Sequence, residues 1–242
     1  MSLLSNARLA VRRLGVDVRR WPDPAQTEPR LVSLLRHHHV STVVDVGANV
    51  GDYGAALREH GFAGAIFSFE PVEAQWAHLQ RRAMRDPLWS PLRYACGDSA
   101  EEVSINVAAN TGASSSVLPM LRRHVEAAPN AGYVRTEMVP QCRLDDMIPT
   151  LGVEAENVLF LKLDVQGYEQ QVLDGAAGVI RQVVGIQIEM SLVPLYEEAM
   201  GYTDVLDWMR RYGYTLKLVI PGFWDQRTGQ QLQVDGVFLR GE

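Results

Sequence analysis

The chain has 242 residues, 47% of them hydrophobic and 21% charged, which suits one compact α/β domain with a sizeable core. Its formal net charge of -6 argues against a nucleic-acid-binding protein with a general basic surface. Cys96 and Cys142 are too few and too far apart in sequence for a disulfide framework or a zinc site, so we interpret both as core thiols in a reducing cytosol. No apolar run is long enough for a membrane span and no signal-peptide pattern is present, so we expect a cytoplasmic protein.

Residues 1–39 are predicted to form an N-terminal helical extension. Apolar residues on one face between Leu3 and Leu14 indicate an amphipathic helix. It would dock on the core or on a sister subunit, giving a homodimer, and a helix lying on a membrane surface is the alternative. A second helix ends at His37, His38 and His39, which fan around the helix end and so favour a solvated terminus over a metal site.

The main domain, residues 40–242, opens with a buried strand over 43–46 that runs into a glycine loop. Gly47 and Gly51 would let the backbone approach a ligand closely. The spacing is Asp-x-Gly-x-Asn-x-Gly, which lacks the diphosphate cradle of Gly-x-Gly-x-x-Gly and of the phosphate loop. Asp45 could instead accept hydrogen bonds from an ammonium group of a nucleotide-like cofactor. The alternative is a plain β–α turn capped by Asn49 or Asp52.

Two further strand ends carry acids. Residues 65–69 predict a strand that ends at Glu70, and an acid about 20 residues beyond the glycine loop takes the ribose hydroxyls in doubly wound folds. Glu70 could alternatively be a first-turn acid of the following helix. A third strand near 92–95 leads to Asp98, which could meet an adenine amino group.

An edge strand over 103–108 is followed by a polar insertion over 110–135 that is too long for an ordinary connection. Such segments are commonly substrate lids or walls, so we expect this one to be a substrate lid. From composition alone, a disordered surface excursion is nearly as compatible with the segment. The insertion carries His124, whose neutral imidazole makes it a candidate general base.

A second buried strand over 158–163 contains Lys162, which requires an acidic partner, and ends at Asp164. A strand over 183–188 ends at Glu189. Two carboxylates at neighbouring strand ends are costly unless a cation, a proton or a substrate hydroxyl lies between them. Asp164 and Glu189 are therefore predicted as catalytic carboxylates that either hold Mg²⁺ or provide a base, and unrelated turn acids are the alternative.

The last helix begins near 202, and strands over 214–220 and 232–239 read as a hairpin. Phe223 and Trp224 in its loop could stack on a sugar, or could be core aromatics. The whole pattern predicts an α/β fold: a doubly wound, mostly parallel seven-stranded sheet with a C-terminal antiparallel hairpin.

Across roughly residues 40–240 the chain resembles the FkbM family of methyltransferases, through Asp45-x-Gly47-x-Asn49-x-Gly51 and Lys162-x-Asp164-x-Gln166-Gly167-x-Glu169, with Glu70-Pro71 and Gly97-Asp98 between them. The resemblance implies a class I methyltransferase fold, S-adenosylmethionine (SAM) as methyl donor, and O-methylation of sugar or polyketide hydroxyls. It is closest to saccharide-modifying members. The predicted cofactor contacts are Asp45, Gly47, Asn49, Gly51, Tyr53, Glu70, Pro71, Gly97, Asp98, Ser99, Asp164 and Gln166.

Two other functional classes agree less well with the sequence. A nicotinamide-dependent oxidoreductase would require Gly-x-Gly-x-x-Gly and a Tyr-x-x-x-Lys relay, and the sequence has neither. A non-catalytic SAM-binding protein would have no need for both strand-end acids. The sequence therefore predicts O-methylation of a small saccharide or glycoside, with a polyketide or other secondary metabolite as the alternative acceptor.

Overall fold

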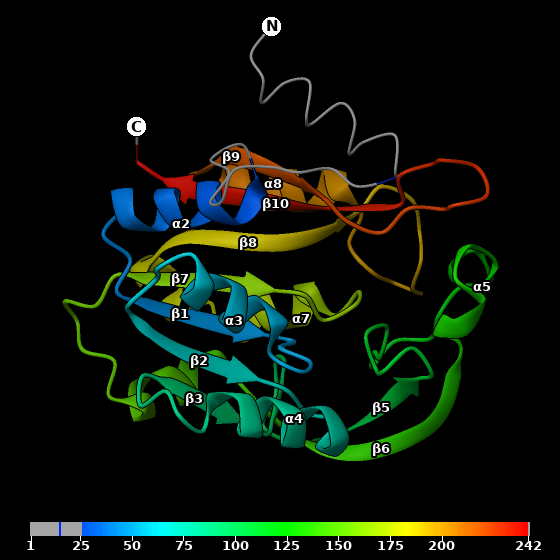
Figure 1. The fold of residues 1–242 in the computed structure, drawn as a ribbon, viewed down its shortest axis with the longest axis horizontal. Helices are drawn as coiled ribbons and strands as arrows, with labels where there is room; N and C mark the ends of the chain where they lie inside the picture. Colours follow the sequence, from blue (N-terminus) through cyan, green and yellow to red (C-terminus); the bar gives the residue numbers. More distant parts are fainter. Residues whose placement is uncertain (1–14, 16–25, 242) are drawn as a thin grey trace, which may run out of the picture.

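The computed structural model describes residue 15 and residues 26–241 of the chain (Figure 1). The amphipathic pattern between Leu3 and Leu14, and the dimer contact expected from it, lie outside the described residues. None of the helices within the described ranges is long and apolar enough to cross a membrane.

A seven-stranded sheet in the order β3-β2-β1-β7-β8-β10-β9 forms the centre of the molecule. The strands from β3 to β8 are parallel, and β10 is antiparallel to both β8 and β9, which confirms the predicted architecture. In this order β2 and β3 lie on one side of β1, whereas β7 and β8 lie on its other side. The strand order therefore reverses between β1 and β7, and a crevice opens beyond the carboxyl ends of these two strands. The strands are β1 (Thr42–Val46), β2 (Ala65–Phe69), β3 (Trp89–Leu92), β7 (Leu159–Leu163), β8 (Val183–Ser191), β9 (Tyr214–Pro221) and β10 (Gln233–Arg240).

Helices cover both faces of this sheet (Figure 1). One face packs against α2 (Thr27–His37), α3 (Asp52–Glu59) and α4 (Glu73–Ala83), in a core that includes Leu35, Leu57 and Leu79. The other face packs against the following elements: α6 (Leu144–Met147), the 3-10 turn η2 (Ile148–Leu151), α7 (Glu169–Asp174), the 3-10 turn η3 (Val179–Gln182) and α8 (Tyr202–Arg211).

A second, three-stranded sheet was not predicted. It has the order β4-β6-β5, formed by β4 (Ala95–Cys96), β6 (Tyr133–Cys142) and β5 (Glu102–Ala108). The expected third strand near 92–95 is thus divided between the two sheets. Much of β6 is exposed, including Val134 and Met138, so it lacks the buried apolar run that reveals a central strand.

The pairing of β4 with β6 brings Cys96 opposite Cys142, and their sulfur atoms are 3.9 Å apart. Both are free, buried thiols, as expected for core residues. Their separation in sequence was a wrong guide to their separation in space, because a long-range strand pair joins them.

The insertion over 110–135 has regular structure rather than forming a disordered excursion. It contains α5 (Arg122–Ala127) and η1 (Pro129–Ala131) and then enters β6. Isolated bridges pair Ser116 with Asn106 and Met120 with Tyr196. Through these two bridges the insertion packs on the main body, on the side where the parallel strands end.

Candidate active site

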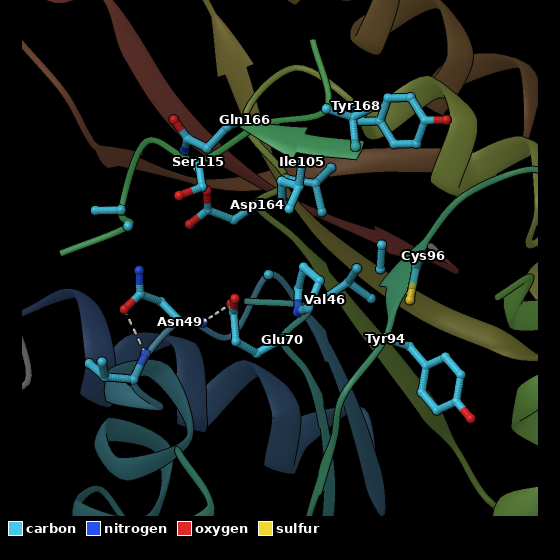
Figure 2. A pocket seen from close by; sticks show the side chains of 18 of the residues that line it. Val46, Asn49, Glu70, Tyr94, Cys96, Ile105, Ser115, Asp164, Gln166 and Tyr168 are labelled. Atoms are coloured by element: carbon cyan, nitrogen blue, oxygen red, sulfur yellow. Dashed lines mark hydrogen bonds between the residues drawn. The ribbon is translucent and has the colours of Figure 1, made fainter. Parts of the chain in front are cut away.

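A cavity of about 370 Å³ lies at the carboxyl ends of β1, β2 and β7 (Figure 2). Its size is in the range of small-molecule sites. Its walls come from the glycine loop, the ends of β2 and β7, β4, β5 and the insertion. They comprise Val46, Gly47, Asn49, Val50, Asp52, Glu70, Pro71, Tyr94, Ala95, Cys96, Ile105, Thr111, Gly112, Ala113, Ser115, Val117, Asp164, Val165, Gln166 and Tyr168.

The glycine loop has a backbone that only glycine fits at its first position. Gly47 has φ +80°, and a Cβ atom there would lie 1.8 Å from the carbonyl oxygen of Asp164. Gly51, with φ +85°, precedes α3 without a side-chain cap, so neither Asn49 nor Asp52 caps that helix. Gly47 therefore allows the ends of β1 and β7 to lie close together, in addition to forming part of a turn.

Every backbone N–H from Gly47 to Gly51 already has a partner. Gly47 and Ala48 donate to Phe69 O, and Gly51 donates to Ala48 O. Asn49 donates to Glu70 Oε2, and Val50 donates to the side chain of Asn49. Phosphate cradles work by presenting free N–H groups to the anion. This loop offers none, so it does not fit a diphosphate.

Glu70 points into the cavity opposite Asp164 (Figure 2). Oε2 accepts from Asn49 N at 2.8 Å and Oε1 accepts from Val72 N at 2.9 Å. Burial raises the pKa of Glu70 to about 7, against the effect of these two hydrogen bonds. Each oxygen keeps a lone pair for a ligand hydroxyl, and the ribose contact of Glu70 stays a prediction. Glu70 precedes α4 and lies outside it, which rules out its role as a residue of that helix.

The charged residues of the cavity wall are all acids. They are Asp52, Glu70 and Asp164, and no Lys or Arg belongs to the described lining. The other end of the cavity is apolar, with Ala95, Ile105 and aromatic side chains. Such a site suits a cationic or neutral nucleoside better than a phosphorylated one.

Asp45 lies beneath this wall and does not line it. It is fully buried in a row across four parallel strands, Ser68-Asp45-Lys162-Gln187. Lys162 Nζ is 3.4 Å from Asp45 Oδ1 and 3.3 Å from Asp164 Oδ2, which confirms the acidic partner expected for this lysine. Burial alone would lower the pKa of Lys162, but the two carboxylates outweigh it and raise that pKa. Lys162 also donates to Gly47 O at 3.2 Å, so this lysine links Asp45 to the glycine loop.

Five further predicted cofactor contacts lie outside the lining: Gly51, Tyr53, Gly97, Asp98 and Ser99. The hydroxyl of Tyr53 donates to Gln187 at 3.1 Å, on the same buried polar row. Gly97 packs on Gln141, whose amide donates to Ser99, while Asp98 is exposed. The chain leaves the cavity after Cys96 because β4 joins the second sheet. Tyr94, Cys96, Ile105 and Tyr168, which were not predicted as contacts from the sequence, line this part of the cavity.

Asp164 and Glu189 come together as predicted, but an amide lies between them instead of a metal. Gln166 Nε2 donates to Asp164 Oδ1 at 2.7 Å and to Glu189 Oε2 at 2.9 Å. Gln233 Nε2 donates to the same Glu189 oxygen at 2.7 Å. No cluster of three His, Cys, Asp or Glu among the described residues could hold a metal ion. The predicted Mg²⁺ site does not fit this donor set, because amide N–H groups occupy the space between the carboxylates.

The two carboxylates differ in environment. Burial, together with the charges of Asp164 and Glu169, raises the pKa of Glu189 well above its usual value, which favours its neutral form. The side chain of Asp164 is 35% exposed and borders the cavity, with Lys162 beside it. Glu189 lies behind Asp164 and does not line the cavity. Of the two, Asp164 is the carboxylate that a bound ligand can reach.

His124 lies behind the cavity wall. Only 2% of it is exposed, and its ring stacks on Phe223 at 5.0 Å and meets Tyr196 edge-on. Its Nε2 is 3.3 Å from Ser114 Oγ. Burial lowers the pKa of His124 to about 4. The ring is thus neutral but has no access to the cavity, so the position expected of a base acting directly on a substrate is not the one observed.

The loop between β9 and β10 leaves the sheet on the same side as the parallel strand ends, as predicted. Phe223 packs between the insertion and the main body, which is the core role left open for it. Trp224 is 46% exposed.

Comparisons with known proteins identify the family of the chain. The sequence model of the methyltransferase FkbM domain matches residues 45–216. No curated protein matches the sequence significantly. Solved structures that resemble the chain include magnesium protoporphyrin IX methyltransferase from Synechocystis PCC 6803 with bound SAM (10% identity, TM-score 0.47, covering 99% of this chain and 92% of that one). A putative SAM-dependent methyltransferase from Listeria monocytogenes also resembles the chain (10% identity, TM-score 0.48, covering 89% of this chain and 98% of that one). So does a SAM-dependent methyltransferase from Aquifex aeolicus (12% identity, TM-score 0.44, covering 97% of this chain and 98% of that one).

Proposed function

Because the chain belongs to the FkbM methyltransferase family and has the class I fold of SAM-dependent methyltransferases, we propose that it transfers a methyl group from SAM to a hydroxyl of a small saccharide or glycoside. The observation that carries this proposal is the acid-lined cavity, whose glycine loop has no free N–H group and whose wall includes the partly exposed carboxylate of Asp164. SAM supplies a methyl group on a positively charged sulfur, and acidic walls favour that charge.

The cofactor is proposed to lie along the cavity from the β2 end to the β7 end. Glu70 receives the ribose hydroxyls through the lone pairs that its two backbone partners leave free. Gly47 and Asn49 provide close backbone contact. The apolar end formed by Tyr94, Ile105 and Tyr168 accommodates the adenine ring.

Asp164 is proposed as the general base. A hydroxyl is a poor nucleophile, and a carboxylate within hydrogen-bond reach can accept its proton as the oxygen–methyl bond forms and the sulfur–methyl bond breaks. Lys162 and the amide of Gln166 hold the two oxygens of Asp164, so its orientation is fixed before substrate arrives. Glu189 acts on Asp164 through the shared amide, and His124 supports the packing of the insertion.

The saccharide is supported by the character of the surrounding groups. The carboxylate of Asp164 and the amide of Gln166, both in the cavity wall after β7, are suitable partners for hydroxyl groups, and Trp224 is available for stacking on a sugar face. The insertion is proposed to act as the lid of this site, because Thr111, Ser115 and Val117 already form part of the wall.

The test is turnover with methyl-labelled SAM on a panel of mono- and disaccharides, polyketide alcohols, phenols, a protein and an RNA. The expected result is label transfer to saccharides, with stoichiometric release of S-adenosylhomocysteine (SAH). Transfer to polyketides alone would establish the alternative acceptor. SAH binding without any transfer would indicate a non-catalytic SAM-binding protein and overturn the proposal.

A further inference from the structure

The loop that follows β7 has an unusual backbone conformation, which contacts from other parts of the chain stabilise. Gln166 has φ +56°, which a residue with a side chain rarely adopts, and Gly167 follows with φ +100°. A Cβ atom on Gly167 would lie 2.9 Å from Tyr196 Cβ. The chain after β7 is therefore pressed against Tyr196, and its conformation depends on what Tyr196 and its neighbours contact.

Two hydroxyl groups from beyond β7 hold Gln166. Ser116 Oγ, on the insertion, donates to the main-chain oxygen of Gln166 at 2.7 Å. The hydroxyl of Tyr196 donates to Gln166 Oε1 at 2.7 Å and lies 3.4 Å from Ser114 O. Gln166, Ser116 and Tyr196 are all buried, so water does not compete for these bonds.

The hydroxyl of Tyr196 holds the acceptor end of the Gln166 amide, and the acceptor-only carboxylate of Asp164 receives the donor end. An amide has one acceptor end and one donor end. With Oε1 bound to the Tyr196 hydroxyl, Nε2 points at Asp164 and Glu189 and donates one N–H to each. The reversed amide would direct its oxygen at two carboxylates and leave Tyr196 facing N–H groups.

We propose that Tyr196 is a positioning residue of the methyl-transfer site, whose hydroxyl orients the Gln166 amide and thereby sets Asp164 and Glu189. This inference rests on the proposed function of Asp164 and adds a residue that no motif contains. It also gives the insertion a mechanical link to the reaction site. Tyr196 pairs with Met120, and the neighbouring Leu195 accepts from Leu121 N, so movement of the insertion moves the hydroxyl.

The charged groups around this arrangement come from several elements. Lys162 lies on β7 and Asp164 directly follows that strand, while Glu169 lies on α7, Asp235 on β10 and Asp45 on β1. Lysine is the only cation of that set. One lysine cannot neutralise all of these acids, so repulsion remains between Asp164 and Glu189. The two N–H groups of Gln166 offset this repulsion.

The first test is a measurement on the amide itself and needs no acceptor. In nitrogen-15 NMR spectra, the side-chain NH₂ of Gln166, assigned by its loss in Gln166→Leu, is expected to exchange slowly with solvent. Tyr196→Phe should accelerate this exchange by about tenfold or more, because a buried hydrogen bond is lost. The matched control is Tyr214→Phe, which removes a hydroxyl bound to Val183 O at 2.9 Å at the opposite end of β8. Unchanged exchange in Tyr196→Phe would overturn the proposal.

The second test is a double-mutant cycle on turnover. Tyr196→Phe is expected to lower kcat about tenfold with the KM for SAM within about twofold, and Tyr214→Phe to leave both unchanged. If Tyr196 acts through the amide, Gln166→Leu and the Tyr196→Phe, Gln166→Leu double variant will have equal kcat values. Multiplying effects would show that Tyr196 acts independently of Gln166 and contradict the inference. Absence of SAH binding in the wild type would instead refute the proposed function, and the NMR result would still decide the role of Tyr196.

Discussion

The backbone N–H groups of the loop from Gly47 to Gly51 all donate to groups within about one βαβ unit of sequence, namely main-chain oxygens and the side chains of Asn49 and Glu70. The pair of Asp164 and Glu189, across the cavity, is held by side chains from distant parts of the chain, including Gln166, Tyr196 and Gln233. A framework made of residues close in sequence suits the cofactor, because the same cofactor is used with any acceptor. A framework assembled from the insertion and the C-terminal strands suits the acceptor end, where the chemistry must be adjusted to one substrate.

This contrast predicts that the two ends can be damaged separately, and the largest effect is expected at Asp164. Asp164→Asn keeps the shape and removes the proposed base, so kcat should fall by about 10²–10⁴ while SAH affinity changes far less. Turnover and calorimetry on the same preparation provide the check. Asp235→Asn, an acid on neighbouring β10 that does not line the cavity, serves as the control for a general loss of negative charge. Equal losses in the two variants would contradict a specific role for Asp164.

At the other end, Gly47→Ala should affect the fold itself. The residue has φ +80° and its Cβ would collide with the main chain at Asp164, so we expect destabilisation by about 3 kcal/mol or more. Gly213→Ala is a matched control, because Gly213 has φ +79° and nothing within 4 Å of the added Cβ. The difference in melting temperature between the two variants measures the collision alone. Similar melting temperatures would mean that the two strand ends are not in close contact.

A smaller effect is expected from pH. Burial raises the pKa of Glu70 to about 7, and the ionised carboxylate is the better acceptor for ribose hydroxyls. Lowering the pH from 8 to 6 should therefore weaken SAH binding roughly tenfold, with proton release on binding near pH 7. Calorimetry in buffers of different ionisation enthalpy detects that release. Glu70→Gln should remove the pH dependence, whereas Glu73→Gln, an exposed acid three residues later, should keep it.

The smallest effect is expected from metal removal. Since the amide of Gln166 occupies the space between Asp164 and Glu189, EDTA should leave turnover unchanged, and added Mg²⁺ should not raise it. Loss of activity in EDTA with recovery in Mg²⁺ would show that the amide moves aside for a cation and would reinstate the metal site predicted from sequence.

The same contrast explains what the sequence could predict. The main sheet, the glycine loop and Glu70 were predictable because strand pattern, glycines and acid follow one another in the chain. The meeting of Asp164 and Glu189 was predictable because parallel strands end at one edge. The amide between them was not, since its orientation depends on Tyr196 and the insertion. The position of Asp98 outside the cavity lining was not predictable, because β6, half exposed and polar, forms a second sheet that the chain joins after Tyr94.

The most direct test of the central claim is calorimetric titration of SAH into the wild type, Glu70→Ala and Asp164→Asn. The wild type should bind one SAH per chain. Glu70→Ala should bind about 10–100-fold more weakly, because hydrogen bonds to a charged group are lost, and Asp164→Asn should stay within a few-fold of the wild type. Absence of binding in the wild type, or unchanged affinity in Glu70→Ala, would contradict the assignment of this cavity to the methyl donor.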